Sequence, residues 1–204
     1  MRDVRPAAVA GTFYPGNAAE LAVAVRECLA GTAAPVAPAA SPKALIVPHA
    51  GYVYSGPIAA GAYARLASLR STIRRVVILG PTHRVAVRGL ALPSARAFAT
   101  PLGDVEVDRE AVATLAGLRQ VVVSDSAHAL EHSLEVQLPF LQSVLDDFRI
   151  VPLAVGDTLA RLRSSLGADY VVMGSYLATG GADSGIRLDV RLQDAVAGET
   201  MVAA

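Results

Sequence analysis

Short apolar runs alternate with segments of helical pattern over most of the chain. Runs of this kind are typical of strands that are buried on both faces of a sheet. We predict strands at residues 44–47, 76–79, 89–92, 121–123 and 148–155. We predict helices at residues 17–29, 57–69, 108–118 and 130–147, the last interrupted at Pro139. Strands that alternate with helices favour an α/β fold with a mainly parallel central sheet flanked by helices.

The pattern changes after residue 157. Residues 186–193 alternate strictly between apolar and polar side chains, which is typical of a half-exposed antiparallel strand. Residues 170–177 provide a second strand, and residues 180–185 a turn between the two. Before them we predict a short helix at residues 159–166. We therefore predict an α/β domain over residues 1–157 and an unrelated α+β fragment with an antiparallel β-hairpin over residues 158–204.

Composition excludes several classes of protein. Hydrophobic residues make up 53% of the 204 residues and charged residues 18%, the opposite of the balance found in disordered chains. The formal net charge is +0 and no basic cluster exceeds two adjacent residues, so a protein that neutralises nucleic-acid phosphates is disfavoured. Prolines and a histidine interrupt the longest uncharged stretch, so we expect no membrane span. The single cysteine, Cys28, fits a reducing compartment, and we expect a cytoplasmic protein.

All four histidines lie between residues 49 and 132, and two of them follow predicted strands. His49 comes two residues after the strand at 44–47, and His83 comes just after the strand at 76–79. Ligands of open α/β sheets bind beyond the carboxyl ends of the strands, so both imidazoles can share one crevice if the strands are neighbours. Paired neutral imidazoles suit Fe, Zn, Cu or Ni. The alternative is two unrelated loop histidines.

A second group of candidates lies near the predicted helix at 130–147. On a helix, His128 and His132 would share a face, and with Glu131 they match the H-x-x-E-H pattern of one class of zinc peptidase. The alternative is an amphipathic helix whose first turn carries polar residues, where Glu131 suits the helix dipole. Tyr52 and Tyr54 are candidates to donate hydrogen bonds to a substrate, or they are packing residues.

Several segments together resemble the Memo family, which is called AmmeMemoRadiSam system protein B in bacteria. They occur in order at residues 4–7, 10–15, 47–56, 78–83, 100–103, 131–140 and 151–156. The resemblance covers residues 1–157 and implies a fold similar to that of class III extradiol dioxygenases, which hold non-haem iron. A shorter stretch in residues 166–200 is similar to a TolB N-terminal-like or FlgO-like module.

The resemblance to the Memo family also implies a function. His49 and His83 match the two histidine ligands of the family's metal site, which favours iron, with zinc or copper as alternatives. It implies a metal-dependent oxidoreductase of unsettled reaction, with a radical-SAM protein and an AMMECR-type protein as partners. The residues expected around the metal or the substrate are Tyr52, Tyr54, His128, Glu131, His132 and Glu135. The alternative is a non-catalytic peptide-binding or scaffold module that uses the same crevice.

One departure from the family pattern concerns the third metal ligand. Family members continue beyond the segment that ends near residue 157 and carry there an S-S-D-x-x-H segment and a late cysteine. Residues 158–204 contain neither histidine nor cysteine. We therefore expect a truncated domain with an impaired metal site. A natural fusion, a truncated gene or a frame artefact would each produce this junction.

Overall fold

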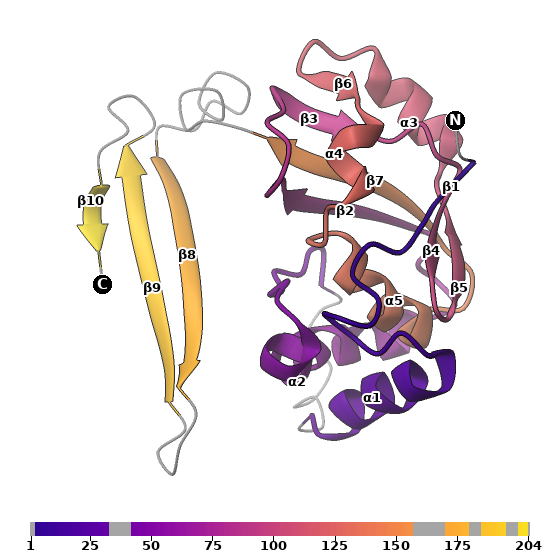
Figure 1. Ribbon diagram of the computed structural model, residues 1–204, viewed down its shortest axis with the longest axis vertical. Helices are drawn as coiled ribbons and strands as arrows, with labels where there is room; N and C mark the ends of the chain where they lie inside the picture. The colour runs from indigo at the N-terminus through magenta and orange to yellow at the C-terminus, as the bar shows by residue number, and fades with distance from the viewer. Residues whose placement is uncertain (1–2, 33–41, 157–169, 180–184, 195–199, 204) are drawn as a thin grey trace.

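The computed structural model describes residues 3–32, 42–156, 170–179, 185–194 and 200–203, and these form an α/β structure with three sheets (Figure 1). The central sheet has four strands, in the spatial order β2, β7, β3, β6. Their bounds are Arg75–Pro81 for β2, Arg149–Gly156 for β7, Gly89–Leu92 for β3 and Val121–Val123 for β6. Each corresponds to a strand predicted from its apolar run.

The central sheet is mixed, which corrects the prediction of a mainly parallel sheet. β2 pairs in parallel with β7, and β3 in parallel with β6, but β3 and β7 are antiparallel, with Leu90 opposite Val155. Only residues 82–88 connect β2 to β3. A parallel return needs a crossover of a dozen or more residues, usually a helix, so this short connection brings β3 back in the opposite direction.

The strand predicted at residues 44–47 does not form. Leu45, Ile46 and Val47 line a pocket of about 710 Å³ together with residues of β2. The segment forms no strand pairing with β2, and Ile46 is fully exposed. Among the described residues β2 is therefore an edge strand of the central sheet.

The helices lie on two sides of the central sheet (Figure 1). On one side are α1 (Ala18–Ala30), α2 (Tyr52–Tyr63) and α5 (Leu138–Val144), which pack on one another, and on the other are α3 (Arg109–Ala116) and α4 (Asp125–Ala129). Asn17, the first residue of the predicted helix, caps α1 by accepting hydrogen bonds from two backbone amides of its first turn. Helix α2 begins at Tyr52, before the predicted start at residue 57, and continues into the 3-10 helix Ala64–Leu69.

The helix predicted at residues 130–147 is broken into pieces. Ser124 caps the short helix α4, which ends at Ala129, and regular structure resumes only with the 3-10 helix Glu135–Gln137 and then α5. Between them the Glu131 carboxylate accepts hydrogen bonds from the backbone amides of His132 and Ser133. A side chain that binds nearby backbone amides competes with helical hydrogen bonds. The prediction that His128 and His132 share one helical face is therefore wrong.

Two further sheets complete the described structure. β1 (Val4–Arg5), β4 (Ala97–Thr100) and β5 (Gly103–Glu106) form one of them. The other confirms the predicted hairpin, since β8 (Tyr170–Thr179) pairs antiparallel with β9 (Gly185–Asp194). β10 (Thr200–Ala203), which the sequence did not predict, pairs with β9. A helix that we predicted at residues 159–166 lies outside the described residues.

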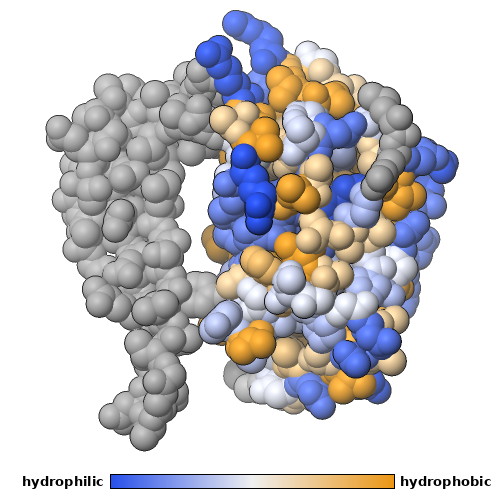
Figure 2. All heavy atoms as spheres, in the orientation of Figure 1, coloured by the Kyte–Doolittle hydropathy of each residue, from blue (hydrophilic) through white to orange (hydrophobic). Residues whose placement is uncertain are grey.

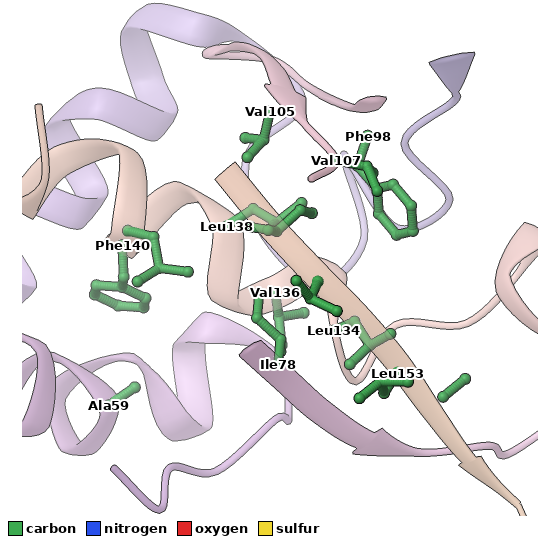
Figure 3. Close-up of a cluster of buried hydrophobic side chains, with 14 of the residues drawn as sticks. Ala59, Ile78, Phe98, Val105, Val107, Leu134, Val136, Leu138, Phe140 and Leu153 are labelled. Carbon is green, nitrogen blue, oxygen red and sulfur yellow. The ribbon is translucent and has the colours of Figure 1, made fainter. Parts of the chain in front are cut away.

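A cluster of buried side chains holds the segment after α4 against the sheet (Figure 3). Leu134, Val136 and Leu138 come from this segment and lie with Ile78 of β2 and Leu153 of β7. Burying each such side chain contributes roughly 1.5–3 kcal/mol. The polar residues that alternate with them form hydrogen bonds instead: Ser133 with Pro81, Glu135 with the N-terminal segment, and Gln137 with Tyr63. None of the helices described in the structure has the length and hydrophobicity that a bilayer span requires.

Candidate metal centre

Three imidazoles meet beyond the end of β2. They belong to His49, which precedes α2, to His83, which follows β2, and to His132, which lies between α4 and α5. One potential ligand atom from each residue lies within 4.8 Å of the other two. The ring centroids of His83 and His132 are 4.4 Å apart, and those of His49 and His83 are 5.3 Å apart. The structure thus joins the predicted pair and adds His132, which the sequence placed only in the surroundings.

A glycine lets the end of β2 approach the loop that carries His132. A Cβ added at Gly80 would lie 2.6 Å from the Ser133 hydroxyl and 2.9 Å from Leu134 Cδ2, so no other residue fits without a shift. The Ser133 hydroxyl donates a hydrogen bond to the Pro81 carbonyl at 2.9 Å. The turn to His83 and the loop of His132 are therefore fixed against each other.

Glu131 orients two of the three histidines. One carboxylate oxygen accepts from His83 Nδ1 at 2.9 Å and from the His132 amide at 2.8 Å, and the other accepts from the His83 amide at 2.7 Å. Burial raises the pKa of this carboxyl, but hydrogen bonds from the Ser133 amide and from His83 outweigh burial and bring the pKa to about 2. Because Glu131 is a carboxylate at neutral pH, His83 Nδ1 carries the proton and Nε2 is left as its ligand atom.

The surroundings of the cluster lower the pKa values of two of its histidines. Burial lowers the pKa of His49, and the neighbouring imidazoles His83 and His132 lower it further. Burial also lowers the pKa of His132, although the Glu131 carboxylate opposes this. Both rings are therefore neutral at pH 7, which is the form that binds metal. The His83 side chain is 38% exposed, so the cluster opens to solvent on that side.

Glu135 lies outside the cluster and holds the N-terminal segment in place. Its carboxylate is fully buried and accepts hydrogen bonds from the Ala8 and Val9 amides and from the Tyr14 hydroxyl. The Arg5 guanidinium pairs with the same carboxylate and also donates to the His128 carbonyl. Burial, and then the hydrogen bond to Glu135, raise the pKa of Tyr14. Glu135 is thus an internal anchor, not a residue that faces the crevice.

His128 is buried apart from the other three histidines. Its Nε2 lies 2.9 Å from the Ala91 carbonyl, to which it donates, and its ring meets Phe98 edge-on. Burial lowers its pKa to about 4, so the ring is neutral at pH 7. In the described structure its Nδ1 has no hydrogen-bond partner. The arrangement that a zinc peptidase needs is absent from the described residues. His128 and His132 lie apart, and the Glu131 carboxylate, which would be the general base, is hydrogen-bonded to His83.

The two predicted tyrosines behave differently. Tyr52 is buried and its hydroxyl donates to the Val136 carbonyl at 2.8 Å, so it contacts the protein interior. Tyr54 is 66% exposed on the outer side of α2. The ring of Phe13, a residue that the sequence did not predict for the site, lies 4.6 Å from that of His132 between centroids. The glycines at positions 11 and 16 mark a tight turn there, but a turn alone does not show where its aromatic residue points.

Comparison with known proteins identifies the family of this chain. The family model of the Memo-like protein matches residues 5–171, most of the chain. The chain belongs to the Memo family. A MEMO1 family protein of Ignicoccus hospitalis is 44% identical over 192 residues, an alignment that covers 84% of this chain and 67% of the relative. A MEMO1 family protein of Aeropyrum pernix is 43% identical over 166 residues, which cover 74% of this chain and 57% of the relative.

The extent of these matches bears on the predicted boundary. The Memo match runs past residue 157, where we placed the end of the domain, so the boundary itself stays a prediction. The chain spans 57% to 67% of the length of these Memo relatives. A Memo relative from Thermotoga neapolitana, 39% identical over 163 residues, is likewise covered over 58% of its length.

Proposed function

We propose that His49, His83 and His132 bind one divalent transition metal and that the protein is a Memo-type, metal-dependent oxidoreductase. The observation that carries the proposal is the convergence of three ring nitrogens within 4.8 Å of one another. Imidazole nitrogens suit Fe, Zn, Cu and Ni, and the resemblance to class III extradiol dioxygenases favours iron. Similarity to that class in fold and chemistry is part of the proposal.

The donor set fits such a metal. His49 and His132 are neutral at pH 7, as a metal ligand must be, and His83 is held by the Glu131 carboxylate in one tautomer. A third imidazole would offset the impairment that the sequence predicts from a missing cysteine. A bound metal would supply Lewis acidity or redox chemistry to a substrate that enters on the exposed side of His83. The roles of the chain's own residues are then to hold the ligands and, through Glu131, to fix their orientation.

Elemental analysis after loading tests the metal proposal. The protein is incubated anaerobically with Fe(II), Zn(II) or Cu(II) and freed of excess ion, and bound metal is measured. We expect one ion per chain in the wild type and a loss in His49→Ala and in His83→Ala. His128→Gln, a change at the histidine outside the cluster, serves as the control and should retain the ion. Equal metal content in all variants would contradict the proposal.

A second candidate function is a peptide-binding or scaffold module. It is favoured by the exposed face of α2 beside His49, where Val53 is 90% exposed and Ile58 43%. Figure 2 shows hydrophobic residues scattered among hydrophilic ones on the face in view, so exposed apolar side chains are not confined to α2. This function predicts that His49→Ala leaves partner binding unchanged while Val53→Asp abolishes it. Loss of partner binding in His49→Ala would instead favour a role for the metal site.

A further inference from the structure

Phe13 contacts two of the three loops that build the histidine cluster. Its ring packs against the ring of His132, with centroids 4.6 Å apart and planes tilted by 48°. Its carbonyl accepts a hydrogen bond from the Tyr52 amide at 2.7 Å, at the start of the helix that follows His49. A Cβ added at Gly51 would lie 3.4 Å from the oxygen of the same carbonyl, so the backbones of Gly51 and Phe13 are in close contact. One residue therefore spans the gap between His49 and His132.

The turn that presents Phe13 is fixed from both ends. The Thr12 and Phe13 amides both donate to the Val9 carbonyl, and the Gly11 amide donates to the Tyr14 carbonyl at 2.8 Å. Gly11 has a φ of +81°, a conformation that glycine adopts without strain. The buried Glu135 carboxylate binds the Val9 amide and the Tyr14 hydroxyl on either side of the turn. The Phe13 ring is thus held in place by contacts that do not involve the histidines.

Glu131 connects the third ligand to this arrangement. It binds the His83 ring and the His132 amide, so His83 and His132 already move together. His49 lies on a separate loop, and in the described residues no hydrogen bond joins its ring to Glu131. The Gln137 amide joins the two loops on one side, since it donates to the Pro48 and Ser133 carbonyls. Phe13 adds a second connection, because it contacts the His132 ring itself and binds the Tyr52 amide with its backbone. Without it, the separation between His49 and the other two imidazoles would be less well defined.

We propose that Phe13 is a positioning residue of the metal centre, which sets the separation of His49 from His132 through its simultaneous contact with the His132 ring and the Tyr52 amide. This inference rests on the proposed metal-binding function. Contacts that orient metal ligands change affinity by about 10- to 100-fold when they are removed.

The test compares two phenylalanines in the full chain. Phe13→Leu removes the ring beside His132 and keeps apolar bulk, and Phe13→Tyr keeps the ring. Phe148→Leu is the matched control, because Phe148 is also half-buried but precedes β7, at the opposite end of the paired strands β2 and β7 from His83. The histidine ring signals are recorded by NMR without metal, and Co(II) is then titrated while its absorption spectrum is followed.

We expect Phe13→Leu to shift the His132 and His49 ring signals of the metal-free protein and to weaken Co(II) binding about 10-fold or more. Phe13→Tyr should restore both, and Phe148→Leu should change neither, even if it lowers the melting temperature. Wild-type ring signals in Phe13→Leu would overturn the inference. If Phe13→Leu does not fold, Phe13→Met is measured with the same two outcomes. If the wild type takes up no Co(II), the proposed function fails, and the metal-free ring signals still decide the role of Phe13.

Discussion

Glu131 and His83 are joined by two hydrogen bonds, one from the ring Nδ1 at 2.9 Å and one from the backbone amide at 2.7 Å. Both end on a carboxylate that is almost fully buried. The pair fixes the tautomer of His83 and the path of the chain after β2. It also explains why Glu131 is unsuited to be a ligand itself, since its oxygens are already bound to backbone and ring donors.

Replacing this carboxylate should weaken metal binding. In Glu131→Gln the amide nitrogen can no longer accept from His83 or from the backbone amides, so we expect the dissociation constant for Co(II) to rise about 10- to 100-fold. Glu110→Gln, an exposed change in α3, is the matched control and should bind as the wild type does. Equal affinities in the two variants would show that Glu131 does not orient the ligands.

The buried pair of Arg5 and Glu135 should be far more important for stability than a surface pair. Arg5→Met leaves a buried carboxylate without its cation, which costs about 3–5 kcal/mol. Arg70→Met breaks the exposed pair with Asp146 and should cost less than about 1 kcal/mol. Urea unfolding measures both free energies, and similar losses in the two variants would contradict the role of Arg5.

The buried His128 predicts a loss of stability in mild acid. Its pKa is about 4 in the folded protein, below the ordinary value of about 6.5. Between these two pH values the side chain is protonated in the unfolded chain but neutral in the folded one. Its contribution is complete above pH 6.5 and is lost as the pH falls toward 4, by up to about 3 kcal/mol. The lowered pKa values of His49 and His132 act in the same direction.

His128→Gln separates this contribution from the others. Glutamine keeps a donor near the Ala91 carbonyl but does not titrate, so the fall in unfolding free energy between pH 7 and pH 5 should be smaller than in the wild type. Urea unfolding at the two pH values gives the difference. An unchanged pH dependence would mean that His128 is not the residue responsible.

The pH dependence of metal binding follows from the same electrostatics. Because the pKa values of His49 and His132 are lowered, protons compete with the metal only below the ordinary histidine pKa of about 6.5. We expect Co(II) affinity to change little between pH 8 and pH 7 and to fall steeply below pH 6. A midpoint above pH 7 would indicate that the imidazoles are not buried together as described.

The sequence predicted the features that depend on local pattern. Apolar runs located β2, β3, β6 and β7, and the rule that ligands bind beyond strand ends holds for His83, which follows β2. His49 joins it although the strand predicted before His49 does not form. The predictions that failed depended on contacts between distant residues. The break after α4 reflects the binding of Glu131 to its own backbone and to His83, which is 48 residues away, and no periodicity reveals that.

The sequence pattern could not place two residues of the site, His132 and Phe13, for the same reason. His132 joins the cluster because the loop after α4 packs against Gly80, and Phe13 joins it because Glu135 binds the N-terminal segment. Residues 44–47 have the composition of a strand, yet they lie beside β2 without pairing with it and line a pocket there instead. Composition reports the tendency of a segment to pair, whereas pairing itself needs a neighbour within hydrogen-bond reach.

An anaerobic Co(II) titration of the wild type and the His132→Ala variant tests the central claim most directly. His132 is the ligand that the fold adds to the pair predicted from sequence, so its removal separates a three-imidazole site from a two-imidazole site. We predict one Co(II) per chain in the wild type and affinity at least about 10-fold weaker in His132→Ala, with a changed absorption spectrum. Identical stoichiometry, affinity and spectrum in the two proteins would contradict the account.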